Sequence, residues 1–350
     1  MRILFAYFGK IIGIRIVSVL VAFVALLVLM DLIDNIEDIL ERRGSLADIA
    51  LFIGYRLPTI VERLIPISVL LGSTLGILSL ASRSELIVLR ATGVSPPKIA
   101  ALGLPVCMVV VLGHLFLAGS VAPYSQQAFI DWWKPFTNQS TTQWLHGDND
   151  LLRIEGISQD GQTLVGLSLF RRDNAGRLIT RMTAAAAKYE DSNWQLFDTS
   201  ELSQGMTGLD IVPTAIKPWP DGPDPDTILN LIALPEQLTK STLGSVLSVA
   251  WSSDADPSVY RTELARRSVG PLTSLVMMFI AASTIRGQNR SGGPQLGAAI
   301  AVALGLTFLV VDGIFASLGK AGVLAPTLAA WTPLVLFVII SGFLLLRVEK

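Results

Sequence analysis

The chain has few of the charged residues, cysteines and histidines on which soluble enzymes and nucleic-acid-binding proteins depend. Only 16% of its 350 residues are charged and the formal net charge at pH 7 is −1, whereas about a quarter of an average soluble domain is charged. Nucleic-acid-binding domains carry a basic excess or a basic stripe, so no nucleic-acid partner is expected. A single cysteine, Cys107, excludes an intrachain disulfide, and two histidines, His114 and His146, offer too few ligands for an ordinary zinc site.

Nucleotide-binding and catalytic motifs are also missing from the sequence. The two Gly-Lys pairs, Gly9-Lys10 and Gly319-Lys320, are followed by Ile and Ala, where a P-loop needs Ser or Thr. No His-Glu-x-x-His and no Gly-x-Ser-x-Gly occurs. We therefore expect no ATP site, no cofactor, no metal and no enzymatic activity. A stand-alone membrane enzyme, which needs a polar cluster within its spans, remains a rival hypothesis without a visible motif.

The sequence is rich in long apolar runs. Hydrophobic residues make up 51% of the chain, its mean hydropathy is +0.57, and a helix needs about 17 to 25 residues to cross the hydrocarbon core. Six long runs without a charged residue lie at 16–30, 64–82, 99–130, 268–285, 291–311 and 321–346. The first run reaches full length if Arg15 extends its side chain to the membrane surface. The pattern predicts a bundle of six transmembrane helices.

Basic residues predict the orientation of these spans. Cytoplasmic loops carry an excess of Lys and Arg. Placing both termini in the cytoplasm gives that side only two acids, Glu85 and Glu349, and ten bases: Arg2, Lys10, Arg15, Arg83, Arg90, Lys98, Arg286, Arg290, Arg347 and Lys350. Both termini are therefore predicted to be cytoplasmic, and the long segment between the third and fourth spans external.

This external segment has the pattern of a β domain. Short alternating stretches are separated by turn signals at Asp160-Gly161, Asn174-Ala175-Gly176 and Asp191-Ser192-Asn193. The predicted strands are Leu152–Ile157, Leu164–Phe170, Leu178–Ala184 and Trp194–Phe197. Their spacing suits a sandwich or barrel-like sheet. The proline-rich stretch from Pro213 to Pro235 is expected to be an irregular return connection, followed by a helix from about Ser258.

This pattern divides the chain into three predicted parts. Residues 1–122 are expected to form the first three spans, 123–265 the external β domain and 266–350 the last three spans. The cytoplasmic loop at 286–294 is expected to be flexible.

A short cytoplasmic helix is predicted over residues 84–92. Ser84 is expected to cap its start, Gly93 to end it in the left-handed conformation, and Ser95-Pro96 to begin the third span. The helix is expected to expose Leu86, Val88 and Leu89 to the cytoplasm. It either rests on lipid or docks into a cytosolic partner. Flanking residues in the docking hypothesis are Arg83, Glu85 and Arg90.

The fifth predicted span carries a stripe of small residues and one acid. Gly297, Ala301 and Gly305 recur every four residues, as do Gly72 and Gly76 in the second span, and such spacing lets helices approach closely. Asp312 lies near the outer end of an otherwise apolar run, where a lone aspartate favours a boundary or packing role over catalysis.

Several stretches resemble a known family, the lipopolysaccharide export permeases LptF/LptG. The most specific is Arg83-Ser-Glu-Leu-Ile-Val-Leu-Arg-Ala-Thr-Gly93 after the second span. Others are Leu64-Ile-Pro66 through Leu70-Leu-Gly72, Tyr189 with Trp194-Gln-Leu196, Pro271-Leu272 through Val276-Met-Met278, and Val311-Asp-Gly-Ile-Phe315. The resemblance covers nearly the whole chain and is greater to LptG than to LptF.

This resemblance implies a function. Members pair as LptF with LptG on two copies of the cytosolic ATPase LptB, and they extract lipopolysaccharide from the outer leaflet of the inner membrane. The lipid enters between the first span of one subunit and the fifth of the other, a lateral gate to which Gly297, Ala301, Gly305 and Asp312 would belong. It leaves along β-jellyroll domains toward LptC. Glu85 would pair with an arginine of the ATPase.

The chain departs from the family at the outer end of the first span. Where LptG members carry lysines, it has Asp31, Asp34, Glu37 and Asp38, so those lipid contacts cannot be transferred. Arg63, Arg266 and Arg267 are the expected headgroup contacts instead, and Arg267 matches a basic position of the family. They either bind the lipid or extend to the membrane surface without binding it. A mechanotransmission permease, which couples ATP hydrolysis to periplasmic motion without carrying lipid, is the other rival, although it typically has four spans.

Overall fold

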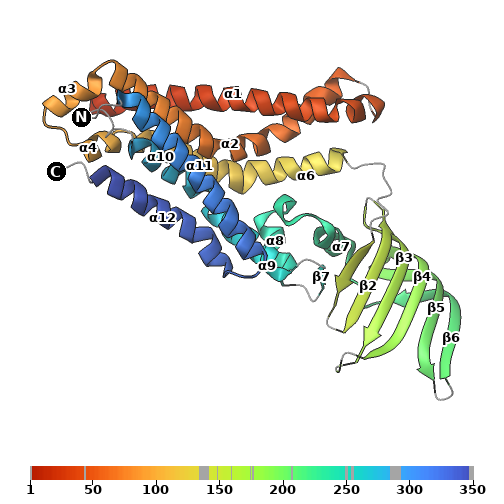
Figure 1. The fold of residues 1–350 in the computed structure, drawn as a ribbon. Helices are drawn as coiled ribbons and strands as arrows, with labels where there is room; N and C mark the ends of the chain where they lie inside the picture. Colours follow the sequence, from red (N-terminus) through yellow and green to blue (C-terminus); the bar gives the residue numbers. More distant parts are fainter. Residues whose placement is uncertain are drawn as a thin grey trace. The chain divides into compact units, whose positions relative to one another are not determined.

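A computed structural model describes the chain in residues 2–42, 45–133, 142–147, 149–158, 160–173, 175, 177–205, 208–248, 251–253, 256–283 and 293–346. The expected flexible loop at 286–294 lies almost entirely outside these residues. Internal contacts divide the chain into a helical unit, Met1–Phe129 with Thr262–Lys350, and a mostly β unit, Ile130–Arg261 (Figure 1). Our expected boundaries, at 122 and 265, concern the membrane surface, which this division does not measure.

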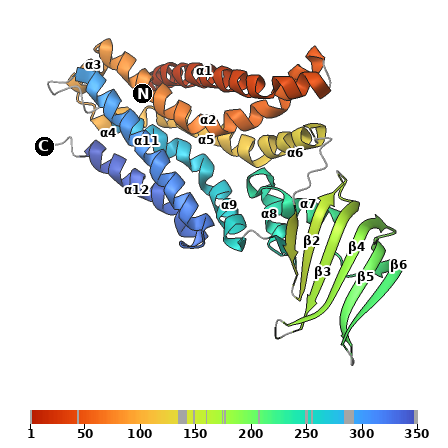
Figure 2. The same ribbon diagram turned by 45° about the vertical axis from the view of Figure 1, so that its right-hand side comes forward.

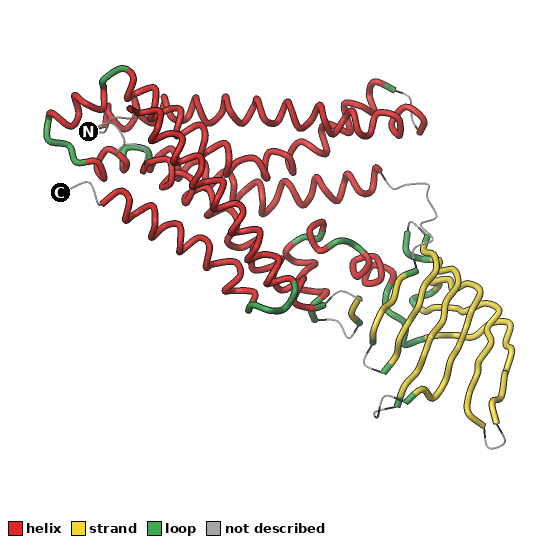
Figure 3. Tube along the Cα trace, in the orientation of Figure 1, coloured by secondary structure: helices red, strands yellow, loops and turns green. Residues whose placement is uncertain are grey.

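Helices account for the first unit (Figure 3). Their bounds are α1 Arg2–Arg42, α2 Leu46–Ser82, α3 Glu85–Ala91, α4 Pro96–Ala101, α5 Leu104–Phe116, the π-helical turn η1 Leu117–Val121, α6 Ala122–Trp133, α9 Pro257–Val269, the 3-10 turn η3 Gly270–Leu272, α10 Thr273–Ala282, α11 Gly293–Lys320 and α12 Pro326–Leu346. Among the described residues, 5 helical segments are long and apolar enough to span a membrane: Ile3–Glu41, Leu46–Ser82, Leu104–Ile130, Gln295–Lys320 and Pro326–Leu345. The chain is a helical membrane protein.

The expected fourth span is not one of these five segments. The helix predicted to begin near Ser258 is present as α9, but it ends at Val269 and gives way to η3, which contains Pro271. Proline has no N–H to donate, so it interrupts the helix there. The ten residues of α10 that follow are largely enclosed by the other helices, including Met277 and Ile280, which have no exposed surface.

The third span also begins later than predicted. Pro96 starts only the six-residue helix α4. A turn at Leu102 and Gly103 then separates it from α5, which begins the candidate span at Leu104. In α5, His114 Nδ1 lies 2.9 Å from Ser274 Oγ of α10, and both side chains are buried, so a polar contact joins the third span to α10.

An antiparallel sheet forms the second unit (Figure 2). Its strands are β1 Gln143–His146, β2 Asp150–Ile157, β3 Thr163–Arg172, β4 Leu178–Glu190, β5 Asn193–Gly205, β6 Gly208–Trp219 and β7 Ser252–Ser253, with helices α7 Pro225–Ile232 and α8 Lys240–Val246 and the 3-10 turn η2 Pro235–Gln237. The strand order is β6-β5-β4-β3-β2-β1-β7. The inserted β domain is confirmed.

The described strands form one sheet, not the two sheets of a sandwich or a jelly roll. Strands β1 to β6 are neighbours in the sheet in the order in which they occur in the chain, and β7 joins the edge beside β1 after α7 and α8. Gly161 at φ 71° and the pair Asp191 and Ser192, at φ 49° and 63°, occupy the left-handed region at two turns that the sequence predicted.

The proline-rich stretch was predicted wrongly. Its first part, Pro213 to Trp219, is not an irregular connection but the second half of β6. This strand lies at one end of the sheet order. A proline at an edge strand loses no ladder hydrogen bond when its nitrogen faces away from the sheet, and this is where strands tolerate it.

Candidate lipid groove and coupling helix

Helix α2 is the centre of the helical unit. In its most apolar stretch 61% of the residues are buried, against 6% in the corresponding stretch of α1. Its small residues permit this enclosure: a Cβ at Gly72 would lie 2.4 Å from the Cα of Ile16, and one at Gly76 would lie 3.2 Å from Ile12 Cγ1. The predicted close packing at Gly72 and Gly76 is confirmed, and its partner is α1.

Helix α11 packs on α2 at Gly305. A Cβ at Gly305 would lie 2.1 Å from Leu70 Cδ2. Ala301 has no exposed surface and Gly297 is buried. Gly305 therefore sets how closely α11 approaches α2, and the other two small residues of the stripe are buried as well.

A groove of about 760 Å³ lies between α1, α2 and α11. Its lining is apolar except for one hydroxyl: Val19, Ala22, Phe23, Leu26, Leu71, Thr74, Leu75, Ala298, Ala299, Val302, Ala303 and Leu306. The Thr74 side chain is almost fully buried, and its Oγ1 has no hydrogen-bond partner among the residues that the structure describes. A surface of this chemistry suits hydrocarbon and offers no anchor for a charged group.

The charged residues that the sequence predicted to lie at the outer ends of the spans are largely paired with one another. Arg266 of α9 binds Asp312 of α11 through two hydrogen bonds, Nη2 to Oδ2 at 2.7 Å and Nη1 to Oδ1 at 3.1 Å. The side chains are 29% and 16% exposed. Asp312, for which the sequence favoured a boundary or packing role, is held by a base of a different helix. The expected headgroup ligand Arg266 already has a carboxylate partner.

Arg63 and Arg267 share a different neighbourhood. Arg267 Nε lies 3.4 Å from Glu263 Oε1, and Lys320 Nζ lies 3.8 Å from Glu263 Oε2. Glu62 interacts electrostatically with Arg63, Arg267 and Glu263. Arg63 itself is exposed on α2. The structure thus brings Arg63 and Arg267 to one charged cluster, apart from the Arg266–Asp312 pair.

Sequence reasoning missed one ion pair between α1 and α2. Arg56 of α2 donates to both oxygens of Asp31, at 2.7 and 2.6 Å, and its guanidinium lies 5.1 Å from the centre of the Phe129 ring. The sequence marked Asp31 as an unusual acid, but it gave no sign of which base would meet it.

The short helix predicted over residues 84–92 is observed as α3, but of the three apolar residues expected to be exposed only Val88 is exposed. Leu86 has no exposed surface and belongs to the hydrophobic core, and Leu89 is partly buried against that core. Ile87 and Val88 are the exposed apolar residues, at 57% and 61%. Leu86 is therefore not available to a partner, because the larger apolar face of α3 is used to attach it to the bundle.

One end of α3 has the predicted conformation and the other does not. Gly93 has the predicted positive φ, at 83°. Ser84 occupies the N-cap position, but its φ is 60° and its side chain makes no cap hydrogen bond. The predicted side-chain cap is wrong, since a residue with left-handed backbone does not present its hydroxyl as an ordinary cap does.

The charged residues of α3 lie at its surface. Glu85 accepts a hydrogen bond from the hydroxyl of Tyr7, 3.0 Å away on α1, a contact that the sequence did not reveal. Arg83 is exposed at the end of α2. Arg90 is half-buried, and this burial lowers the pKa of its guanidinium.

Comparison with known proteins assigns this arrangement to a family. The family model described as "Lipopolysaccharide export system permease LptF/LptG" matches residues 6–347. The lipopolysaccharide export system permease protein LptG of Escherichia coli strain K12 is 28% identical over 356 residues, which cover 97% of each chain. The protein of the same name from Haemophilus influenzae is 22% identical over the same shares. The chain belongs to the LptF/LptG family of lipopolysaccharide export system permeases.

Proposed function

We propose that this chain is the LptG-type permease subunit of an ATP-driven transporter that takes lipopolysaccharide from the outer leaflet of the inner membrane. The observation that carries the proposal is the apolar groove between α1, α2 and α11. These helices are the first, second and fifth predicted spans. The groove receives acyl chains of the lipid.

The depth of the groove suits an outer-leaflet lipid. Thr74 follows Arg63 by eleven residues of continuous helix, which corresponds to about 16 Å at 1.5 Å per residue. Half of a hydrocarbon core of about 30 Å has nearly this thickness. A headgroup at the level of Arg63 therefore places its acyl chains beside the groove.

Arg63 and Arg267 are the proposed headgroup contacts. Arginine forms bidentate hydrogen bonds with phosphate, and both residues lie in one charged cluster. Arg266 takes a secondary part, because Asp312 already holds its guanidinium. Gly297, Ala301 and Gly305 are assigned to the lateral gate, where Gly305 packs against Leu70 of α2.

The partners follow from membership of the export system. The chain pairs with an LptF-type permease through exposed apolar residues of α1 such as Val17 and Val21, which are 58% and 60% exposed. An LptB dimer docks on α3 through Ile87 and Val88, flanked by Arg83, Glu85 and Arg90. The β domain passes the lipid toward LptC.

The proposed location is the inner membrane, with both termini in the cytoplasm and the β domain in the periplasm. The support is the excess of basic residues in the termini and short loops. An Asp160→Cys variant should react with a membrane-impermeant maleimide in whole cells. Reaction only after lysis would reverse the orientation.

Filling the groove tests the function directly. Val302→Trp places a large ring among the lining residues, and Val310→Trp, on the same helix at a position that is 62% exposed, is the matched control. In a reconstituted complex with the paralogue and the ATPase, we expect Val302→Trp to abolish lipopolysaccharide stimulation of ATP hydrolysis and Val310→Trp to retain it. Equal stimulation of both variants would remove the groove from the transport path. A parent complex that contains no lipopolysaccharide would instead favour mechanotransmission.

A further inference from the structure

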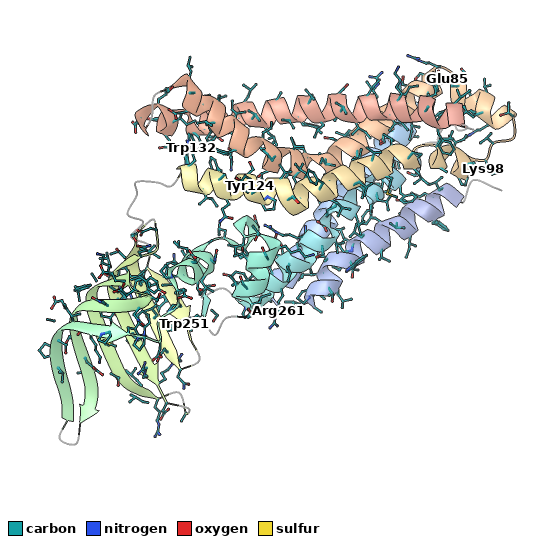
Figure 4. The ribbon with its side chains drawn as sticks, turned by 180° about the vertical axis from the view of Figure 1, so that it is seen from behind. Glu85, Lys98, Tyr124, Trp132, Trp251 and Arg261 are labelled. Carbon is teal, nitrogen blue, oxygen red and sulfur yellow. The ribbon has the colours of Figure 1, made fainter. Side chains whose placement is uncertain are left out.

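A hydrogen bond between α1 and α3 connects the proposed ATPase contact to the helix that lines the groove. The Tyr7 hydroxyl donates to Glu85 Oε1 across 78 residues of sequence, and the two side chains lie at the surface of the helical unit. Figure 4 shows Glu85 at the end of this unit that also carries Lys98. An exposed contact of this kind contributes little to folding, so its position invites a functional explanation.

Both partners are attached to rigid neighbours. Phe8, next to Tyr7, is 3% exposed, and its ring meets the Tyr7 ring edge-on at 6.3 Å between centres. Leu86, next to Glu85, is fully buried. The hydrogen bond therefore fixes the carboxylate between two anchored backbones.

Tyr7 uses only one of the two carboxylate oxygens of Glu85. Oε1 accepts the phenol proton, and a carboxylate oxygen accepts further hydrogen bonds from other donors. The second oxygen, Oε2, keeps its capacity to accept a hydrogen bond from a basic group. The tyrosine thus orients the carboxylate without neutralising it.

Helix α1 connects the Tyr7–Glu85 hydrogen bond to the groove. Tyr7 and Phe23 lie on one continuous helix, sixteen residues and about 24 Å apart. Phe23 lines the groove. Between them, Ile16 is pressed against Gly72 of α2. Movement of α3 can reach the groove along α1, whose residue Ile16 belongs to the same hydrophobic core as Leu86 of α3.

We propose that Tyr7 is a positioning residue for energy coupling: it orients Glu85 toward a basic side chain of the ATPase and passes the movement of α3 to α1. This inference rests on the proposed function, because it takes α3 as the ATPase contact. If Tyr7 serves only to hold the end of α1, its hydroxyl affects stability and not coupling.

The test compares two tyrosines that differ in their hydroxyl contacts. Tyr7→Phe removes only the donor. Tyr124→Phe is the matched control, since Tyr124 is 79% exposed on α6 and lies away from α3 (Figure 4). The complex with the paralogue and the ATPase is reconstituted in lipid nanodiscs. The readouts are the affinity for the ATPase and the ratio of lipopolysaccharide-stimulated to basal hydrolysis.

We expect Tyr7→Phe to lower both the affinity and the stimulation ratio by about fivefold to tenfold, the loss typical of a single exposed hydrogen bond, and Tyr124→Phe to match the parent. In a Glu85→Ala background, Tyr7→Phe should have no further effect, because the two residues act as one unit. Parent-like values for Tyr7→Phe, or equal losses with and without Glu85, would overturn the proposal. The affinity for the ATPase can be measured without lipopolysaccharide. It therefore tests the role of Tyr7 even if lipopolysaccharide does not stimulate hydrolysis by the parent complex.

Discussion

Helices α1 and α2 are similar in length, with 41 and 37 residues, yet they differ sharply in their surroundings. Most of the apolar stretch of α2 is buried, and almost none of that of α1 is. Large side chains such as Val21 and Leu29 project outward from α1. Glycines at 72 and 76 let α1 pack closely on α2. Hydropathy predicts that both helices lie in a membrane. The size of the residues at their contact explains why α2 is the buried helix and α1 the exposed helix that lines the groove.

Breaking the contact between these two helices should have the largest effect. Gly72→Ala puts a methyl group 2.4 Å from the backbone of Ile16, which cannot move aside as a side chain can. We expect a loss of about 3 kcal/mol or more of stability, at the upper end of overpacking effects. Thermal unfolding of the purified complex measures it. Gly54→Ala, on the same helix with nothing within 4 Å of the added Cβ, is the control and should unfold at or slightly above the temperature of the parent, because alanine favours a helix more than glycine does.

The two faces of α3 should separate stability from partner binding. Leu86→Ala empties a fully buried site and should cost about 2 to 3 kcal/mol. Val88→Ala, at an exposed site, should leave the melting temperature unchanged and reduce recovery of the ATPase. If the Leu86→Ala protein kept the melting temperature of the parent but no longer bound the ATPase, the assignment of the buried and exposed faces of α3 would be wrong.

The ion pair between α9 and α11 should have a smaller effect. Asp312→Asn removes the charge partner of Arg266 at a partly exposed site and should cost about 1 to 2 kcal/mol, between the values for surface and buried pairs. Exchanging the residues, as Arg266→Asp with Asp312→Arg, should restore the melting temperature. No recovery in the exchanged protein would mean that the pair does not hold the helices together.

The smallest effect is expected at the ion pair that ties α1 to α2. Asp31→Asn keeps the shape of the side chain and leaves Arg56 stacked near Phe129, so the cost should be about 1 kcal/mol or less. Hydrogen exchange of α1 amides should increase, while that of α2 amides should not. Equal changes in both helices would contradict the view that α1 is the more independent of the two.

Features fixed by neighbouring residues were predictable from the sequence. Apolar runs located most spans, Asp191-Ser192-Asn193 located a hairpin, and Gly93 located a helix end. Contacts between distant residues were not: neither Arg266 with Asp312 nor Tyr7 with Glu85 has a local signature, because helix packing brings them together. The prediction of an irregular connection at Pro213 was wrong because the sequence does not show that this residue belongs to a strand at the edge of a sheet.

The burial of Leu86 shows a related limit. Periodicity correctly placed Leu86 and Leu89 on one face of a short helix. It does not say whether that face meets the protein's own core or a partner. The core residues that cover Leu86 come from other parts of the chain.

The most direct test of the account is photo-crosslinking from the groove. A photoreactive amino acid replaces Phe23, which lines the groove, and in a separate control it replaces Val109, which is 68% exposed on α5 and does not line it. In membranes with the assembled transporter, we expect Phe23 to capture lipopolysaccharide and to lose it when ATP is supplied, while Val109 captures bulk phospholipid in both conditions. Equal capture of lipopolysaccharide at both positions, or none at Phe23, would contradict a transport path along this groove.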